Sequence, residues 1–291
     1  KPSAASSDTA AKDSSPATTA AAGSRDNTPV VLTGSADGTV TYGNDSVTVD
    51  ASHTEEGYLM VSYSGSNSKV KLQITGSDEI TYTYNLHDGY ETFPLTSGSG
   101  SYTVGVFENI EGTSYSTLFT QAIDVTIQDE FGPYLYANQY VNFSADSKVI
   151  SKAMELSASA NDDLEVIENV YNYIITNFTY DYDKAASVQS GYLPDVDKVF
   201  TEQTGICFDY AAVMASMLRC ERIPTRLEVG YMGDVYHAWI STYIKDKGWV
   251  NGIIEFDGND WKLMDPTFAS TSSDPKDFLT QTDEYITKYV Y

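Results

Sequence analysis

The chain has 291 residues, which is enough for two folded units that each bury a core. Its 41 Asp and Glu residues, against 17 Lys and Arg residues, give a formal net charge of −24 at pH 7. A surface that negative repels the phosphates of nucleic acids and anionic lipid headgroups, so nucleic acid is excluded as the expected partner.

The first 29 residues contain 18 Ala, Ser or Thr and no Leu, Ile, Val or aromatic residue. Such a composition cannot repay the entropy of folding, so residues 1–29 are predicted to be a disordered spacer. Spacers of this kind are typical of secreted or lipid-anchored proteins at the bacterial cell surface. No run reaches 18 apolar residues, and we therefore expect an extracellular or cell-surface protein without a transmembrane segment.

Residues 30–128 alternate apolar and polar side chains with a period of two, as in KVKLQIT, EITYTYNL and AIDVTIQ. Turn-forming clusters such as SGSNS and LTSGSGS separate these stretches, and no helical pattern interrupts them. The pattern predicts an all-β, immunoglobulin-like sandwich over residues 30–128. This unit is interpreted either as a binding or spacing module or as a stabilising unit without a ligand of its own.

Beyond the predicted sandwich, apolar residues recur at every third or fourth position. This period predicts a helix over residues 147–157, a second over 162–178 with an acidic capping box at its start, and a third from Cys207. Strand patterns follow in TRLEVGYM, HAWISTYI, NGIIEF and WKLMD. Helices followed by an antiparallel meander predict an α+β domain over residues 129–291.

Both cysteines lie on the third predicted helix, where Cys207 and Cys220 are thirteen residues, or roughly 20 Å, apart. This separation exceeds disulfide reach, so both are predicted to be free thiols, with Cys220 an inert part of the core. Cys207 is either a packed hydrophobe or a nucleophile. The amides and dipole at a helix start stabilise a thiolate and predict a lowered pKa for Cys207. Gly205 permits close backbone approach, and the amide of Cys207 is a candidate oxyanion donor.

A thiolate nucleophile requires a base, and the chain has three histidines. His53 and His87 lie in polar, turn-like stretches of the predicted sandwich. His237 opens the predicted strand HAWISTYI directly after a loop, where a scaffold holds side chains at a cleft rim. Asp265 ends the strand WKLMD before a proline and is a candidate to orient the histidine. If the two strands are neighbours, His237 and Asp265 both reach the helix start that carries Cys207.

These positions fall in motifs that resemble the transglutaminase-like core. The matching residues are Gly205-x-Cys207-x-x-Tyr210-Ala211, Leu218-Arg219 with Ile223-Pro224 and Arg226, Gly230-Tyr231, His237-Ala238-Trp239, and Trp261 four residues before Asp265-Pro266-Thr267. The resemblance spans about residues 165–268 and is closest to bacterial extracellular members with an N-terminal β-sandwich. It implies a papain-like α+β fold of helices and an antiparallel sheet. Carried over to this sequence, it implies Cys207 as nucleophile, His237 as general base and acid, and Asp265 as the orienting carboxylate.

Some assignments stay open at the level of the sequence. Gln203 and Tyr180 are both candidates for the second oxyanion donor on chemical grounds. The segment between His237 and Asp265 holds two tryptophans where the family often has a single Gly-Trp step; we take Trp261 as the family position and read the extra residues as an insertion. Three aromatic residues around the histidine either line an acyl groove or belong to the core: Tyr231, Tyr236 and Trp239. Three others, Tyr134, Tyr136 and Tyr140, form a second groove wall or, as we expect, pack between the domains.

The combined interpretation is a cysteine-dependent enzyme that transfers acyl groups from protein or peptide amides through a thioester. Hydrolysis, as in a peptidase or deamidase, is favoured over cross-linking because water is the default acceptor in an aqueous compartment. The alternative is a non-catalytic surface binding or scaffold protein with the same fold. We expect a monomer that acts on a protein or peptide at the cell surface or in the cell wall, with no cofactor and no metal. The acidic composition raises the question of calcium, but the sequence has no EF-hand loop.

Overall fold

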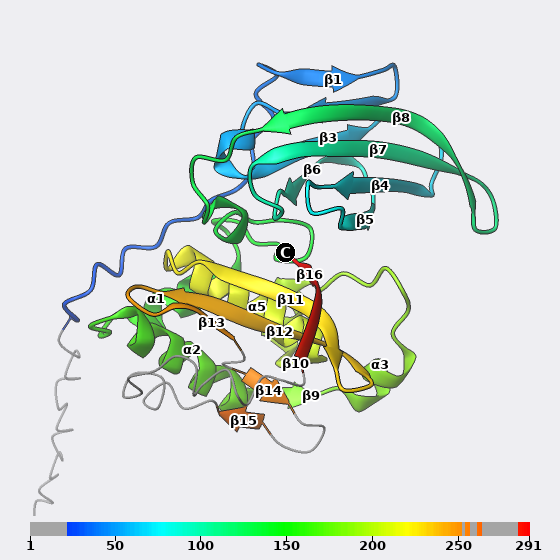
Figure 1. Ribbon diagram of the computed structural model, residues 1–291. Helices are drawn as coiled ribbons and strands as arrows, with labels where there is room; N and C mark the ends of the chain where they lie inside the picture. Colours follow the sequence, from blue (N-terminus) through cyan, green and yellow to red (C-terminus); the bar gives the residue numbers. More distant parts are fainter. Residues whose placement is uncertain (1–21, 252–253, 257–260, 264–284) are drawn as a thin grey trace, which may run out of the picture.

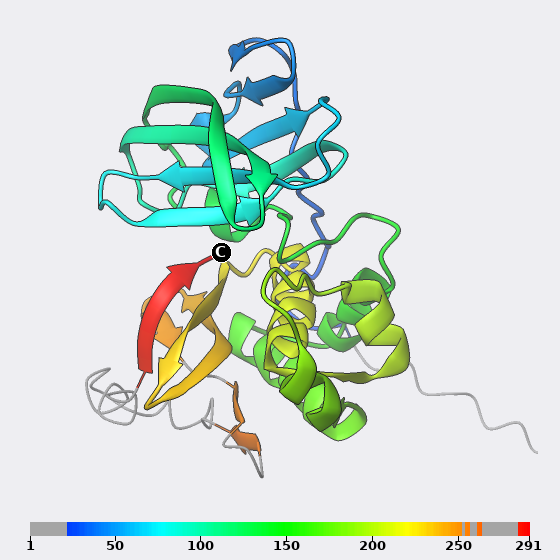
Figure 2. The same ribbon diagram turned by 90° about the vertical axis from the view of Figure 1, so that its right-hand side faces the viewer.

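The computed structural model describes residues 22–251, 254–256, 261–263 and 285–291. A β unit lies above a mixed α/β unit, and the C-terminus ends at their junction (Figures 1 and 2). The expected combination of a β sandwich followed by an α+β core is confirmed. None of the helices in the described part of the chain is long and apolar enough to cross a membrane.

The first unit consists of two four-stranded antiparallel sheets. One has the strand order β1-β2-β3-β6, with β1 Thr41–Gly43, β2 Val47–Asp50, β3 Tyr58–Tyr63 and β6 Gly89–Pro94. The other has the order β5-β4-β7-β8, with β5 Thr81–Asn85, β4 Val70–Thr75, β7 Gly100–Glu111 and β8 Ser114–Val125. A single 3-10 turn, η1 Thr54–Glu56, precedes β3.

The period-two pattern of the sequence places one face of each sheet in a shared core. In β4 the side chains of Val70, Leu72 and Ile74 are buried and those between them are half-exposed. Leu59 and Phe93 of the other sheet are fully buried in the same cluster. Apolar burial between the two sheets therefore holds the sandwich together.

The second unit begins with a 3-10 turn, η2 Gly132–Tyr134, and contains five helices among the described residues. These are α1 Lys148–Ser157, α2 Asp163–Asn177, α3 Tyr182–Ser187, α4 Val196–Glu202 and α5 Cys207–Cys220. The predicted helices over 147–157 and 162–178 and the helix from Cys207 are confirmed. The start of α2 is capped by the Asp162 carboxylate, which accepts from the amide of Glu165 at 2.9 Å. Helices α3 and α4 are too short to leave an apolar period in the sequence.

The main sheet of this unit has the order β13-β12-β11-β16 and is antiparallel. Its strands are β11 Thr225–Met232, β12 Val235–Ile244, β13 Gly248–Asn251 and β16 Tyr285–Val290. Two short pairs stand apart from it: β9 Thr179–Tyr180 with β10 Thr204–Gly205, and β14 Ile254–Phe256 with β15 Trp261–Leu263. The stretch NGIIEF, expected as one strand, is therefore divided between β13 and β14.

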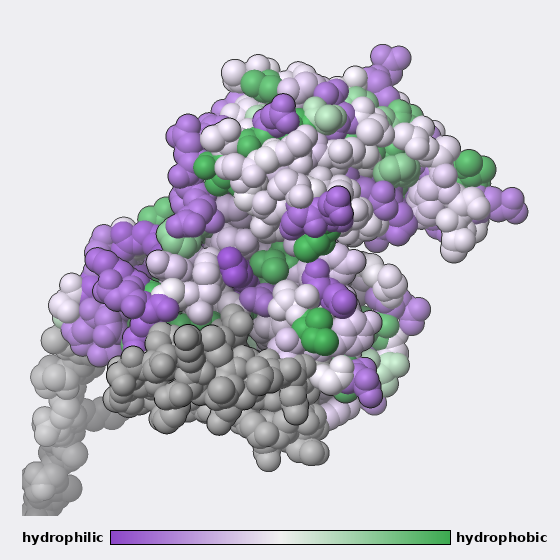
Figure 3. Space-filling view, in the orientation of Figure 1, coloured by the Kyte–Doolittle hydropathy of each residue, from purple (hydrophilic) through white to green (hydrophobic). Residues whose placement is uncertain are grey.

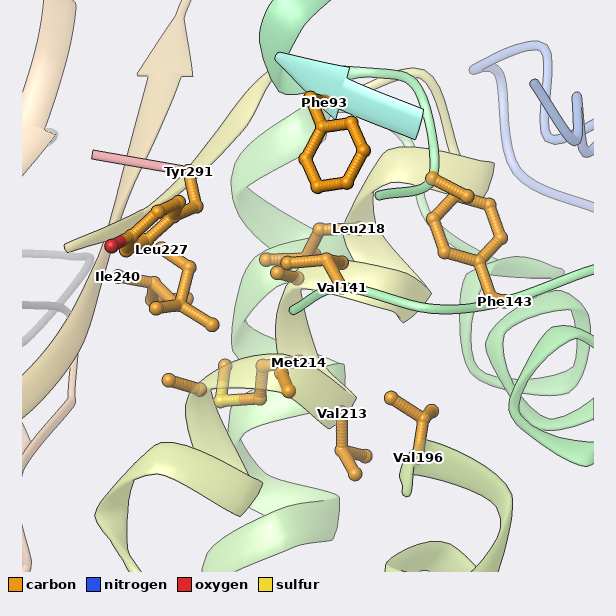
Figure 4. Close-up of a cluster of buried hydrophobic side chains, with 14 of the residues drawn as sticks. Phe93, Val141, Phe143, Val196, Val213, Met214, Leu218, Leu227, Ile240 and Tyr291 are labelled. Atoms are coloured by element: carbon orange, nitrogen blue, oxygen red, sulfur yellow. The ribbon is translucent and has the colours of Figure 1, made fainter. Parts of the chain in front are cut away.

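Helix α5 is the centre of the second unit, and nearly all of its side chains are buried. It packs against β11 and β12 on one side and against α1, α2 and α4 on the others. Figure 4 shows Met214 and Leu218 of α5 facing Leu227 and Ile240 of the sheet. A helix buried all round is held rigidly, which fixes the position of its first residue.

The two units meet through a continuous aromatic and apolar core. Tyr84 of the sandwich packs on Tyr140, with 5.9 Å between ring centroids, and on Tyr291, with 6.0 Å. Gln139 donates to the carbonyl of Asn85 at 2.7 Å. Hydrophobic residues also appear along this junction on the face shown in Figure 3. Tyr140 and Tyr136 of PYLYANQY thus pack between the domains, Tyr136 on Tyr58 with 4.7 Å between ring centroids, whereas Tyr134 packs on Trp249 of the second unit.

Residues 22–35 run over the second unit toward the sandwich (Figure 1). Arg25 Nε donates to the Asp163 carboxylate at 2.6 Å, and the amide of Val30 donates to the carbonyl of Cys220 at 2.7 Å. Residues 22–29 therefore form specific contacts, contrary to the disordered spacer expected over 1–29. The remainder of that predicted spacer, residues 1–21, lies outside the described residues.

Candidate functional site

Cys207 is the first residue of α5, as predicted. Two features of the chain hold it there: α5 is buried, and the preceding strand β10 pairs in parallel with β9, placing Gly205 opposite Tyr180. The amide of Asp181 donates to the Gly205 carbonyl at 2.9 Å. Cys207 is partly exposed, whereas Cys220 is buried and its thiol donates to the Met217 carbonyl at 3.0 Å. Both thiols are free, as expected.

The Cys207 sulfur accepts hydrogen bonds from the backbone amides of Ala238 and Phe208 and from the hydroxyl of Tyr180. The Phe208 amide is one of the unpaired donors of the helix start. The Ala238 amide belongs to the peptide that joins His237 to Ala238. The sulfur therefore lies against β12, next to the backbone of His237.

The predicted lowering of the Cys207 pKa is wrong for the resting protein. Burial raises the pKa of this thiol above its ordinary value and outweighs the amides of Ala238 and Phe208, while the nearby Asp209 carboxylate raises it further. Burial disfavours the thiolate because a charge loses its hydration in a low-dielectric interior. The resting thiol is consequently neutral at pH 7.

His237 is the third residue of β12, because the strand begins at Val235, two residues earlier than predicted, and it pairs with Gly230 of β11. The residue is 7% exposed, and its ring stacks on that of Trp239 with an interplanar angle of 29° and 6.2 Å between centroids. Burial lowers the pKa of His237 to about 4. The imidazole is therefore neutral at pH 7, the form that can accept a proton from a thiol.

Asp265, the third predicted residue, lies outside the described residues. The strand expected to carry it is β15, which pairs with β14, whereas β12 pairs with β11 and β13. The condition considered from the sequence, that the strands of His237 and Trp261 are neighbours, is therefore not met by the pairings of the described residues. Strand β14 approaches β12, so the β14–β15 pair is a separate element beside the main sheet.

The two candidates for the second oxyanion donor occupy different places. The Tyr180 hydroxyl contacts both the amide and the sulfur of Cys207. Gln203 instead caps α4 in the left-handed region (φ 51°) and donates to the Tyr173 hydroxyl at 3.3 Å. The structure therefore brings Tyr180, and not Gln203, into contact with Cys207. Burial raises the pKa of Tyr180 to about 12, so its hydroxyl keeps its proton at pH 7.

The aromatic residues that flank His237 divide into two groups. Trp239 is buried and packs edge-on against Tyr285, with centroids 5.0 Å apart, so it belongs to the core. Tyr231 and Tyr236 are exposed and contact each other at 5.4 Å between centroids. They lie near the β11–β12 turn and are the members of the set available to a ligand.

Sequence reasoning missed a polar cluster under Cys207. The Asp209 carboxylate is completely buried and accepts from the Ile206 amide at 2.8 Å, from Lys184 Nζ at 2.7 Å and from the Tyr192 hydroxyl at 2.5 Å. An acidic residue at the third position of a helix is the signal that could have revealed it. Within the described residues, no group of three or more His, Cys, Asp or Glu side chains is arranged to hold a metal ion.

Part of the second unit is similar to known proteins. Residues 150–252 match the model of the transglutaminase-like superfamily. The UPF0252 protein MJ1282 of Methanocaldococcus jannaschii is 30% identical over 90 residues, which are 29% of this chain and 24% of that protein. The chain thus spans about a quarter of the length of that relative.

Solved structures show only weak overall similarity. A protein inferred to be a cysteine protease, from Cytophaga hutchinsonii, is 18% identical, with a TM-score of 0.35 over 78% of this chain and 68% of that one. The periplasmic domain of TgpA from Pseudomonas aeruginosa is 15% identical, with a TM-score of 0.34 over 78% of this chain and 97% of that one.

Proposed function

We propose that the chain, in which residues 150–252 match the transglutaminase-like superfamily, is a cysteine-dependent enzyme that cleaves protein or peptide amides through a thioester. Cys207 is the nucleophile, His237 is the general base and acid, and Asp265 is the orienting carboxylate. The single observation that carries the proposal is the contact of the Cys207 sulfur with the amide beside His237, at the start of a buried helix.

The proposed reaction begins from the neutral pair. The thiol proton passes to the imidazole of His237 as the sulfur attacks the substrate carbonyl and a C–S bond forms. The C–N bond then breaks, and the imidazolium returns its proton to the departing amine or ammonia. In the second half-reaction water gives a proton to His237 and attacks the thioester, and the C–S bond breaks to restore the thiol.

The negative charge on the attacked carbonyl oxygen requires donors. We assign this role to the backbone amide of Cys207, which belongs to the nucleophilic residue itself, and to the hydroxyl of Tyr180, which contacts the sulfur. In the resting protein the Cys207 amide points at the Tyr180 oxygen, so substrate has to displace that hydroxyl from the amide. Tyr180 then donates to the same oxyanion without leaving the site.

The final acceptor is proposed to be water, which makes the protein a peptidase or deamidase and not a cross-linking enzyme. Water is the default acceptor at a site open to solvent, and Cys207 is partly exposed. An extracellular or cell-surface location, a monomeric state and a substrate of the cell surface or cell wall are part of the same proposal.

The test uses p-nitrophenyl acetate, a small activated ester that any accessible thiol nucleophile can open. We expect a burst of nitrophenolate and an acetyl group on the Cys207 peptide by mass spectrometry, with Cys220 unmodified. Cys207→Ser should abolish the burst, and His237→Ala should slow it by about 10²-fold or more. A lysine ester added during turnover then tests the acceptor: acetate is the product if water is the acceptor, and acetyl-lysine is the product if the amine is.

Acetylation of Cys207 that is equally fast in His237→Ala would contradict an activated Cys-His pair. Absence of acetylation at every pH between 6 and 10 would favour the alternative, a binding or scaffold protein in which Cys207 is a packing residue. The Cys220 peptide serves as the internal control for non-specific modification.

A further inference from the structure

The buried Asp209 carboxylate ties three separate parts of the chain to the start of α5. Its partners are the Ile206 amide at the helix start, Lys184 Nζ of α3, and the Tyr192 hydroxyl in the loop that follows α3. Lys184 also lies over the Tyr192 ring, 4.4 Å from its centroid. Each oxygen of the carboxylate thus has a donor, as a buried carboxylate requires.

This arrangement leaves little room for movement around Cys207. A Cβ at Gly205 would come within 2.6 Å of the Asp209 Cβ, so the strand before the nucleophile is packed directly on this side chain. The Phe208 ring contacts the Tyr192 ring, with centroids 6.4 Å apart. The segment from Lys184 to Tyr192 is therefore held against the residues on both sides of Cys207.

Asp209 also brings a negative charge close to a thiol that must ionise. Its carboxylate opposes formation of the Cys207 thiolate. Lys184 pairs with Asp209 at 2.7 Å and supplies the compensating positive charge, with its side chain 27% exposed. Tyr180 of β9 also contacts the thiol, and His237 of β12 precedes the Ala238 amide that donates to it.

We infer that Asp209 is a positioning residue for the nucleophile and that Lys184 neutralises the charge that Asp209 brings to Cys207. The inference rests on the proposed function, since it assigns these residues a role only if Cys207 reacts as a thiolate. Asp209 holds the amides of the helix start in place, and the Asp209–Lys184 pair sets how readily the thiol ionises.

The experiment measures the rate of iodoacetamide alkylation of Cys207 between pH 7 and 10 in the full chain, with Cys220 as internal control. Asp209→Asn keeps an oxygen for the Ile206 amide and removes the negative charge, so the apparent pKa of Cys207 should fall. Lys184→Met keeps the length of the side chain and leaves Asp209 unpaired, so the pKa should rise by about half a unit or more. The double variant should return toward the native value, and Lys184→Arg should stay close to it.

The opposite signs distinguish this role from a merely structural one. Loosening of the helix start would expose the thiol in both single variants and would move the pKa of Cys207 down in both, toward its ordinary value, which would overturn the inference. If Asp209→Asn does not fold, Lys184→Met still decides: an unchanged or lowered pKa of Cys207 in that variant contradicts the proposal. A Cys207 that alkylates as slowly as Cys220 in every protein would instead count against the proposed function itself.

Discussion

At the scale of single residues, the candidate site combines a neutral thiol with a neutral imidazole. Burial raises the pKa of Cys207 and lowers that of His237 to about 4, so neither side chain carries a charge at rest. Both shifts have the same cause, the loss of hydration by the charged form. Proton transfer from Cys207 to His237 therefore has to accompany the attack on substrate. The amides that donate to the sulfur stabilise its negative charge during this step.

The buried His237 makes stability depend on pH. Its pKa is lower in the folded chain than the ordinary value of 6.5, so the unfolded chain binds a proton first. The free energy of unfolding is therefore unaffected by this group above pH 6.5 and falls by about 3 kcal/mol as the pH is lowered from 6.5 to 4. Urea unfolding at a series of pH values should show this loss in the native protein and a smaller one in His237→Gln. Equal slopes in both proteins between pH 6.5 and 4 would contradict it.

Tyr180 provides the second prediction at this scale. Tyr180→Phe keeps the ring between Tyr182 and Tyr210 and removes only the hydroxyl. Loss of one oxyanion donor should lower kcat for a p-nitrophenyl ester by about 10²-fold and leave KM within a few-fold, since the donor acts on the transition state. Gln203→Ala, at the rejected candidate, is the matched control and should keep its kcat. A fall in kcat confined to Gln203→Ala would reverse the assignment.

At the scale of elements, the nucleophile depends on how β10 meets α5. Gly205 has an ordinary negative φ and is required for space, because a Cβ there would approach the Asp209 Cβ to 2.6 Å and its Oδ2 to 2.8 Å. The close approach of strand and carboxylate therefore sets the entry into the helix.

Substitution at Gly205 should damage both stability and reactivity. Gly205→Ala should reduce the free energy of unfolding by about 1–3 kcal/mol, the usual cost of overpacking, and should slow the acetylation of Cys207 by p-nitrophenyl acetate. Gly112→Ala, in the β7–β8 turn, has open space around its Cβ position and serves as a comparison without overpacking, although its φ of 54° adds backbone strain that Gly205 does not have. Native acetylation rates in Gly205→Ala would show that the contact with Asp209 is not needed.

At the scale of the whole molecule, Arg219 joins the parts of the second unit to the domain boundary. The guanidinium is 1% exposed and donates to the carbonyl of Tyr136 at 2.7 Å, to that of Thr225 at 2.8 Å, and to the main-chain oxygen of Tyr291 at 2.8 Å. Burial lowers the pKa of Arg219 to about 9, so it stays protonated at pH 7. One side chain of α5 thus fixes the segment between the domains, the start of β11 and the residue after β16.

Removal of this guanidinium should be costly. Arg219→Leu removes the guanidinium donor from three carbonyl groups, of which that of Tyr291 still accepts from the Leu227 amide at 2.9 Å. We expect a loss of about 3 kcal/mol or more in the free energy of unfolding. Arg222→Leu, which removes an exposed ion pair with Asp26, should change it by less than about 1 kcal/mol. Urea unfolding of both variants measures the difference. Similar small losses in the two proteins would show that the junction does not depend on Arg219.

The sequence by itself determined the two-unit architecture, the long helices and the position of Cys207 at a helix start. These features follow from local signals: a period of two in KVKLQIT, a period of three to four in α2, and the apolar run after Gly205. The transglutaminase-like motifs added the interpretation of His237 as its partner. Local patterns are sufficient for these features because the spacing of apolar residues within each helix or strand determines which of its faces is buried.

Tertiary structure alone decided the electrostatics of the site and the choice among its helpers. Burial raises the pKa of Cys207, whereas the sequence predicted a lowered one. Packing places Tyr180, and not Gln203, beside the thiol. Strand β15 pairs with β14 and not with β12. Asp209, Lys184 and Tyr192 come together from three segments that no spacing rule connects. Desolvation and contacts between distant segments depend on the completed fold, and the local sequence does not encode them.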